Sequence, residues 1–264
     1  MLSNRGEAGT ALDIGSDTER VFSQALQDYV KVLYKLQQAT PLPSGGKGEP
    51  FVATTALARG IGTTPAATTK MIKHLAEHHL VEHTPYRGVR LTPVGEKVAL
   101  EVIRHHRLLE AYLHEALGYG WDEVDAEAER LEHHISEAFE ERIERMLGNP
   151  QTDPHGNPIP TRDGIMPPAR GTSLADAEAG DTLVVVRVSD RSAEALRYLA
   201  NIGMTIQAVV EVTDKQPFNG PLTLRIGDKT HALGRELAGH VFAERHGGNH
   251  AATATAAAKG GGDK

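Results

Sequence analysis

The sequence contains no cysteine among its 264 residues. Disulfide bonds and thiolate metal ligands are therefore excluded, and the composition fits a reducing compartment. No apolar run approaches the roughly twenty residues that a membrane-spanning helix needs. The first residues are polar, with Gly and Asp where a signal peptide would be apolar. We therefore expect a cytoplasmic protein that does not use a membrane as a partner.

Aromatic residues are also scarce, at 5% of the chain. A regulator that senses a small organic molecule would need an apolar pocket, usually with aromatic walls. A regulator that senses a small molecule and needs no metal ion is therefore disfavoured.

The charged residues are segregated by sign along the chain. Residues 51–107 hold eight Lys and Arg against four Glu, a local charge of +4, whereas residues 108–150 hold twelve acidic residues against three Arg, a local charge of −9. A DNA-binding module followed by a cation-binding module would have this distribution. The net charge of −7 therefore does not argue against nucleic acid as a partner.

Composition and periodicity divide the chain into six segments and predict a mainly α protein with a small β domain. The expected segments are a disordered N-terminus (1–20), a winged helix-turn-helix (21–92), a helical dimerisation and metal-binding domain (93–148), a Pro/Gly-rich linker or ordered arm (149–172), an SH3-like barrel (173–246) and a disordered tail (247–264).

The winged helix-turn-helix is predicted from the order of its elements. Pro65 fits the first turn of a helix, where its missing N–H costs little, and Gly60 and Gly62 form the preceding turn. A two-stranded hairpin with basic residues at its tip follows. The expected elements are helices over 23–38, 54–59 and 64–79, a loop over 41–50 and a hairpin over 81–93.

In such modules the second helix enters the major groove, and basic side chains hold phosphates. Small hydroxyl and apolar groups read few bases through paired hydrogen bonds, so specificity would depend partly on DNA shape. A protein contact through the same helices is the alternative. The predicted DNA contacts are Thr63, Thr64, Pro65, Thr68 and Thr69 on the helix, with Lys70, Lys73, Arg87 and Arg90 at the phosphates.

Two long helices are predicted next, over 93–117 and 122–147, with the sequence GYGW between them. Their apolar face is wider than one small domain needs, which indicates a homodimer, although an intrachain core would also explain it. A two-fold dimer would place its recognition helices about 34 Å apart on a palindromic operator. The residues of this face are Val98, Val102, Leu109, Leu113, Ile135, Phe139 and Ile143.

These two helices also carry the candidate metal ligands at helical spacing. Carboxylates and imidazoles without thiolates suit Mn(II), Fe(II), Co(II) or Ni(II) better than a structural zinc ion. A solvated acidic helix is the simpler alternative. The candidates are His106 and Glu110 on the first helix, and Asp125, Glu129, Glu132 and His133 on the second.

The C-terminal stretches TLVVVRV, IQAVVEV, LTLRI and THAL predict short strands, with a helix over 193–200. We find no catalytic signature there, so an enzyme is not expected. A helical carboxylate metalloenzyme would need Glu-x-x-His pairs, whereas this chain has Glu-x-x-Glu-His beside a DNA-binding module.

The helix-turn-helix, the segments HHRLLEAYL and DEVDAEAERLEHHISEAFEERI, and GNPIP before a β domain resemble the DtxR/MntR family of metal-dependent transcriptional regulators. The run IGDKTHALGRELAGHV is similar to the FeoA-related SH3-like domain of many members. The resemblance covers residues 22–245. It implies a regulator, of the repressor type, that controls metal-homeostasis genes and binds DNA when a metal ion is bound.

The resemblance also implies the ligand sets. Iron-type members have Met and Cys at the positions of Asp28 and Glu129, whereas manganese-type members have carboxylates, as here. Mn(II) is therefore favoured, with Fe(II) second and other divalent transition metals able to bind in vitro. The implied primary site is Asp28, Glu129, Glu132 and His133, and the implied second site is His106, Glu110 and Asp125.

Two features depart from the family pattern. Lys31 stands where manganese-type members have another carboxylate, one turn after Asp28, which argues against their close two-metal cluster. The ligands that an SH3-like domain sometimes adds cannot be aligned, and Asp190 and Glu194 are the nearest acidic candidates. The bound metal would fix the first helix against the dimerisation helices and so act as a co-repressor through a population shift.

Overall fold

The computed structural model describes residues 22–40, 50–190 and 192–246. The described residues form two compact units. We call them the helical unit (residues 22–40, 50–153 and 158–168) and the β unit (residues 154–157, 169–190 and 192–246). The two ends predicted to be disordered, and nearly all of the predicted loop 41–50, lie outside the described residues.

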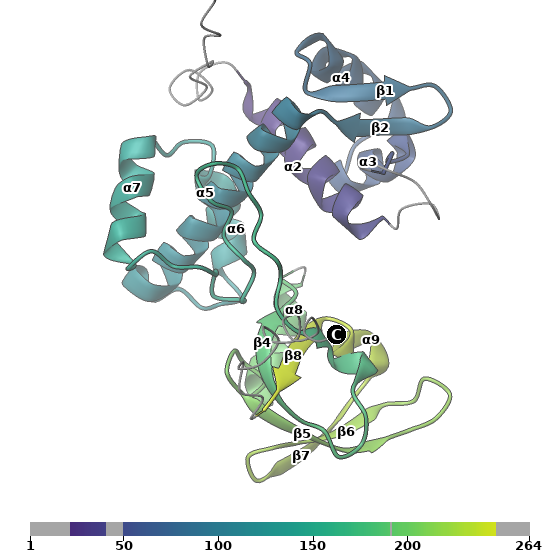
Figure 1. Ribbon diagram of the computed structural model, residues 1–264, viewed down its shortest axis with the longest axis vertical. Coiled ribbons are helices and arrows are strands. Elements are labelled where there is room, and N and C mark those ends of the chain that lie inside the picture. Colours follow the sequence, from purple (N-terminus) through teal and green to yellow (C-terminus); the bar gives the residue numbers. More distant parts are fainter. Residues whose placement is uncertain (1–21, 41–49, 191, 247–264) are drawn as a thin grey trace, which may run out of the picture. The chain divides into compact units, whose positions relative to one another are not determined.

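The helical unit begins with a winged helix-turn-helix, as predicted (Figure 1). Gly62 ends the second of its helices in the left-handed conformation, with φ of 74°, which glycine adopts without steric cost. The Thr64 hydroxyl then caps the third helix by accepting from the Ala67 N–H at 3.2 Å. The elements are α2 (Gln24–Ala39), α3 (Thr54–Ile61), α4 (Pro65–Glu77), β1 (Val81–Thr84) and β2 (Gly88–Leu91).

The core of the winged helix-turn-helix is continuous with the next helix. Leu33 on α2, Leu57 on α3, Leu75 on α4 and Val89 on β2 are all completely buried. The same cluster includes Ile103 of α5 (Pro93–Leu117). Because α2 shares this core with both α4 and α5, a displacement of α2 would also displace α4.

The sequence prediction of one long helix over 122–147 is wrong. The structure has two helices, α6 (Val124–Leu131) and α7 (Glu137–Met146), separated by residues 132–136. The Ser136 hydroxyl accepts from the Phe139 N–H at 3.3 Å and so starts a new helix. The break leaves Glu132 and His133 at the C-terminal end of α6.

The predicted dimer face also needs correction, because most of it is core within one chain. Five of its seven residues, Val98, Val102, Leu109, Leu113 and Ile143, are at most 5% exposed, and Ile135 is half-buried. Val98 belongs to the core of the winged helix-turn-helix, whereas Leu109 and Leu113 pack with Ile143 in a second core formed by α5, α6 and α7. Phe139 remains exposed, together with Leu117 and Met146, which were not predicted.

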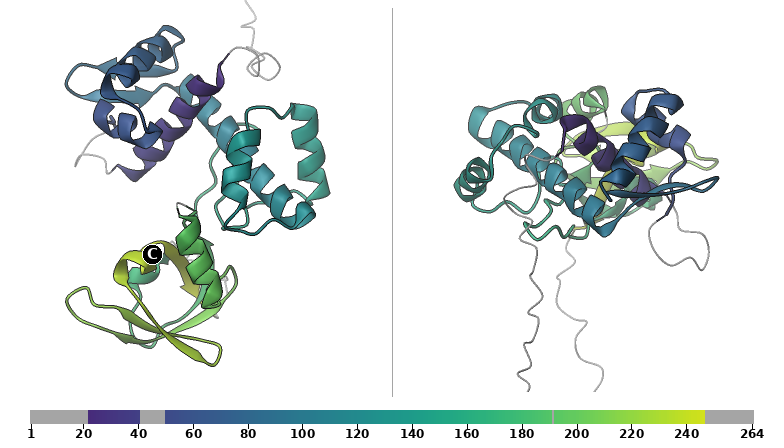
Figure 2. Two further views of the ribbon diagram at one scale, coloured as in Figure 1. Left: turned by 180° about the vertical axis from the view of Figure 1, so that it is seen from behind. Right: turned by 90° about the horizontal axis from the view of Figure 1, so that it is seen from above.

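The β unit contains an antiparallel six-stranded sheet in the order β3-β8-β4-β5-β6-β7. Its elements are coloured from green to yellow (Figure 2). The four predicted strands and the predicted helix are present, whereas β3 and β8 were missed. The strands are β3 (Thr172–Ser173), β4 (Thr182–Val188), β5 (Val209–Lys215), β6 (Leu222–Ile226), β7 (Lys229–Leu233) and β8 (Val241–Arg245), and the helices are η1 (Leu174–Asp176), α8 (Ala193–Asn201) and α9 (Arg235–Ala238).

The segment before the sheet is ordered, in agreement with the extended arm that was one reading of residues 149–172. Gly156, with φ of 81°, packs so closely on β4 that a Cβ there would lie 2.1 Å from the carbonyl oxygen of Val186. The neighbouring His155 carbonyl accepts from the Val188 N–H at 2.8 Å.

Among the described residues, no helix has the length and apolar character that crossing a membrane requires.

A buried charge network joins α5 to α7. The guanidinium of Arg104 donates to Glu140 at 2.6 Å, to Glu144 at 2.7 Å and to the carbonyl of Pro160 at 2.8 Å. His105 lies 3.0 Å from the other Glu140 oxygen. Burial opposes ionisation of Glu140, but the hydrogen bond and charge of His105, with the charge of Arg104, lower its pKa from 4.5 to about 2.

We expect Glu140→Gln to lower the free energy of unfolding by about 3 kcal/mol at neutral pH, because it leaves Arg104 and His105 with less buried countercharge. The loss should shrink as the pH falls from 4.5 toward 2, where the native carboxylate itself becomes protonated. Urea unfolding across this range measures it, with the exposed Glu137→Gln as the control. A difference that stays constant down to pH 2 would contradict the role given to the Glu140 charge.

Candidate metal centre and nucleic-acid interface

All seven predicted ligands gather in one cluster between α2, α5 and α6. It forms three groups whose ligand atoms lie within 4.8 Å of one another. Glu132 belongs to two of these groups, and so does His106. The groups are Asp28, Glu132 and His133; His106, Glu110 and Asp125; and His106, Glu129 and Glu132.

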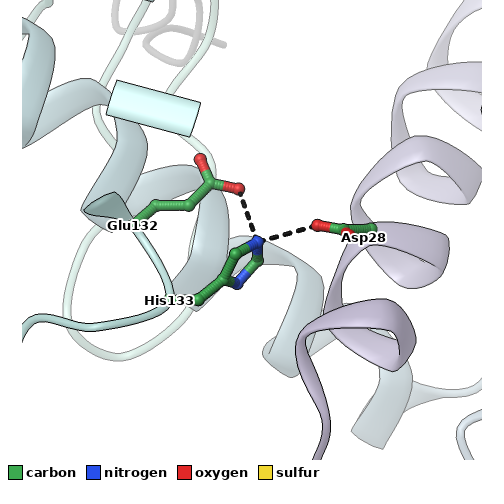
Figure 3. Close-up of side chains that lie close together, drawn as sticks. All are labelled: Asp28, Glu132 and His133. Atoms are coloured by element: carbon green, nitrogen blue, oxygen red, sulfur yellow. Dashed lines mark ion pairs between the residues drawn. The ribbon is translucent and has the colours of Figure 1, made fainter. Parts of the chain in front are cut away.

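The first group, which we call the α2 trio, joins α2 to the end of α6 (Figure 3). Nε2 of His133 lies 2.7 Å from Oδ1 of Asp28 and 3.3 Å from Oε1 of Glu132. The ligands of one octahedral ion with bonds of about 2.1 Å would lie about 3 Å apart. The spacing of these three atoms therefore suits a single transition-metal ion.

The orientation of the His133 ring is fixed from α2. Its Nδ1 lies 2.6 Å from the amide oxygen of Gln27, and an amide oxygen only accepts, so Nδ1 donates to Gln27. Nε2 is buried and faces the carboxylates of Asp28 and Glu132. A metal ion between these three groups would bind Nε2, and Gln27 would orient the ring.

The second group, which we call the α5 trio, combines the buried His106 and Glu110 with the half-buried Asp125. Nε2 of His106 lies 3.3 Å from Asp125 and 3.6 Å from Glu110, whose side chain has no exposed surface. Burial disfavours a charged ring, but hydrogen bonds with Asp125, Glu110 and Glu132 outweigh it and raise the pKa of His106 to about 10. A metal ion at this nitrogen must therefore displace a proton.

The third group already surrounds a positive charge. Nζ of Lys31 lies 2.7 Å from Glu129, 2.7 Å from both Glu132 oxygens and 3.3 Å from Nδ1 of His106. Burial disfavours its charge, but Glu132 and Glu129 outweigh that effect and raise the pKa of Lys31. Glu129 is therefore placed with Lys31 and His106, and not with Asp28 and His133 as the resemblance implied.

The sequence analysis did not identify Gln27 as a partner of His133 or Lys31 as a partner of the carboxylates. For Lys31 one signal was present, because positions 28 and 31 lie one turn apart on the same helix face. A cavity of about 330 Å³ adjoins the α2 trio and is lined by Gln27, Glu132 and His133 among others. It leaves room for water molecules that would complete a coordination shell.

The two acidic residues considered in the β unit are described within that unit alone. Asp190 accepts a hydrogen bond from Asn157 at 3.3 Å, and Glu194 is exposed in the first turn of α8. Neither belongs to a group of three potential ligands among the residues that the structure describes.

The predicted DNA contacts on α4 and in the two residues before it are accessible with one exception. Thr64, Pro65, Thr69, Lys70 and Lys73 are exposed, and Thr63 is half-buried. Thr68 has no exposed surface, and its hydroxyl lies 3.5 Å from that of Tyr29. The prediction for Thr68 was therefore wrong, because this position of the helix faces α2.

The two arginines of the hairpin differ. Arg87 is exposed at the tip, and its guanidinium lies 4.5 Å from the centre of the Phe51 ring. Arg90 is half-buried and donates to Glu82 at 2.9 and 2.7 Å. Arg87 is thus the more available cation for a phosphate, whereas Arg90 would first have to leave its carboxylate.

Three stretches of the chain match known protein families. Residues 21–89 match the iron dependent repressor, N-terminal DNA binding domain, and residues 92–161 match the iron dependent repressor, metal binding and dimerisation domain. Residues 172–245 match the FeoA domain.

Individual relatives agree. The iron-dependent repressor IdeR of Mycobacterium leprae is 30% identical over 151 residues, which are 57% of this chain and 60% of that protein. The diphtheria toxin repressor of Corynebacterium glutamicum is 26% identical over 78% of this chain and 92% of its own. The chain thus spans about 60% of the length of the first relative and nearly all of the second.

Solved structures extend the match. A manganese-dependent transcriptional repressor in complex with manganese is 37% identical, with a TM-score of 0.74, over 84% of this chain and all of its own. The manganese regulator SloR is 26% identical, with a TM-score of 0.66, over 84% of this chain and 98% of its own. These relatives are repressors and regulators, not enzymes.

The orientation of His133 by Gln27 predicts a measurable effect. Gln27→Leu removes the acceptor that fixes the ring, so we expect Mn(II) affinity to fall by about 10- to 100-fold. Calorimetric titration of metal-stripped protein measures this, with the exposed Gln24→Leu on the same helix as the control. Equal affinity in both variants would show that Gln27 does not support a ligand.

Proposed function

The chain belongs to the DtxR/MntR family of metal-dependent transcriptional regulators, and from this premise we propose that it is a repressor whose binding to DNA requires a divalent metal ion. The observation that carries this proposal is the α2 trio. Asp28 lies on a helix of the winged helix-turn-helix, whereas Glu132 and His133 lie at the end of α6. An ion held by all three would tie the DNA-reading part to the dimerisation helices.

The proposed metal is Mn(II), with Fe(II) second. The donors in the α2 and α5 trios are carboxylate oxygens and imidazole nitrogens, without sulfur, which suits Mn(II) more than the softer members of the series. Other divalent transition metals would still bind in vitro, since affinity rises along the series from manganese to copper.

The residues of the cluster explain how metal binding in the α2 trio would change the affinity for DNA. The carboxylates of Asp28 and Glu132 repel each other, so without a cation between them this repulsion works against the attraction of Lys31 and favours a larger separation of α2 from α6 at Asp28. Because α2 and α4 share one core, such a movement changes the position of α4. The metal supplies the positive charge that favours the closed arrangement, and DNA affinity then rises by population shift.

We further propose that the operator is a palindrome bound by a homodimer in the cytoplasm, with recognition helices about 34 Å apart. The exposed apolar side chains of Leu117, Phe139 and Met146 are available for the dimer. The proposed DNA contacts are Thr63, Thr64, Pro65, Thr69, Lys70, Lys73 and Arg87, with Arg90 in a secondary position.

The proposal is tested by removing the ligand that α2 contributes. Asp28→Ala should leave a folded dimer whose DNA affinity no longer rises with Mn(II), whereas the native protein should gain at least about tenfold. The assay uses DNA from upstream of metal-transport genes at fixed salt. Glu127→Ala on α6, whose carboxylate pairs with Arg130 outside the cluster, is the control. Stimulation that survives Asp28→Ala would sink the assignment.

The DNA-binding surface is tested separately. Lys73 is exposed on α4, so Lys73→Ala should weaken binding similarly on all sequences and reduce the slope of log affinity against log salt by about 1. Lys229→Ala, an exposed lysine of the β unit, serves as the control. An unchanged slope would remove Lys73 from the interface.

A further inference from the structure

Lys31 is held inside the carboxylate cluster. Its side chain is 3% exposed, and that of Glu132 is completely buried. Three carboxylate oxygens, one from Glu129 and two from Glu132, lie 2.7 Å from its nitrogen. An ammonium group has three N–H donors, so one acceptor lies at hydrogen-bond distance for each of them.

This arrangement resembles the coordination of a cation. Buried charges are costly unless they are paired and hydrogen-bonded. Here each of the three N–H groups of the Lys31 ammonium has a carboxylate oxygen within hydrogen-bond distance. The four residues of this arrangement come from three helices: Lys31 from α2, His106 from α5, and Glu129 and Glu132 from α6 and its end. A single lysine thus makes the connections that a metal ion at this point would make.

We propose that the ammonium group of Lys31 is a resident cation that takes the place of one metal ion between the carboxylates of Glu129 and Glu132. The inference rests on the proposed function and deepens it. Exchangeable ions are then confined to the α2 trio and the α5 trio, on either side of Lys31. Glu129 acts as the partner of Lys31 and does not ligate metal.

The charges of the cluster agree with this division. Five carboxylates bring five negative charges, and one ammonium with two divalent ions would bring five positive ones. Before any metal binds, Lys31 already attracts α6 toward α2 and offsets part of the repulsion there. The five carboxylates are those of Asp28, Glu110, Asp125, Glu129 and Glu132.

The first test counts bound Mn(II) ions per chain on metal-stripped native protein and on Lys31→Glu. The glutamate should admit one additional ion, and its electron paramagnetic resonance spectrum should show spin coupling between Mn(II) ions that share a carboxylate. Lys31→Arg keeps the cation and should leave the count unchanged. Lys35→Glu makes the same charge change at an exposed position of α2 and should also leave it unchanged.

The second test measures thermal unfolding. Lys31→Met keeps the length of the side chain without its charge, so the metal-free variant should unfold about 5–10 °C lower than the native protein. Saturating Mn(II) should recover most of this loss, because an ion can enter the vacated position. Lys35→Met should show neither effect. A variant that Mn(II) does not rescue would overturn the inference, since the ion would then be unable to replace the ammonium.

The number of bound ions tests the role of Lys31 independently of DNA binding. If native protein and Lys31→Glu bind the same number of ions, Lys31 yields its position to metal and the inference fails, while the proposed function stands. If the native count is lower by one but Mn(II) does not alter DNA affinity, the proposed function fails and the resident cation stands.

Discussion

Charge compensation between α2, α5 and α6 is the constraint on which the proposed function depends. Five carboxylates from these helices belong to the cluster, and their repulsion must be offset before the helices can pack closely. Lys31 supplies part of the positive charge from within the chain, and a metal ion in the α2 trio would supply more. In the proposed mechanism the position of α4 depends on this balance, because α4 shares its core with α2.

Local signals made much of the fold predictable from the sequence. The ends of α5 agree with the prediction, because Thr92 caps its start and Gly118 ends it in the left-handed conformation. The break between α6 and α7 was not predictable in this way. Residues 132–135 continue an acceptable helical pattern, but the side chains of Glu132 and His133 contact Lys31, His106 and Asp28 on other helices.

The ligands themselves could be predicted, but not how they are grouped. Helical spacing and family resemblance together brought all seven residues to one place. Their partners depend on contacts between positions about a hundred residues apart, such as Lys31 with Glu129 and Gln27 with His133. Thr68 illustrates the same limit, since its burial follows from the angle at which α4 packs against α2 and not from its spacing.

A cation that belongs to the polypeptide has an evolutionary consequence. Chelation or metal starvation cannot remove it, so this part of the compensating charge is constant while the ions beside it vary with supply. Lysine and glutamate codons differ in a single base. If Lys31 replaces one metal ion, a single base change in its codon would alter the number of ions that such a regulator binds. The rest of the helical unit would stay the same.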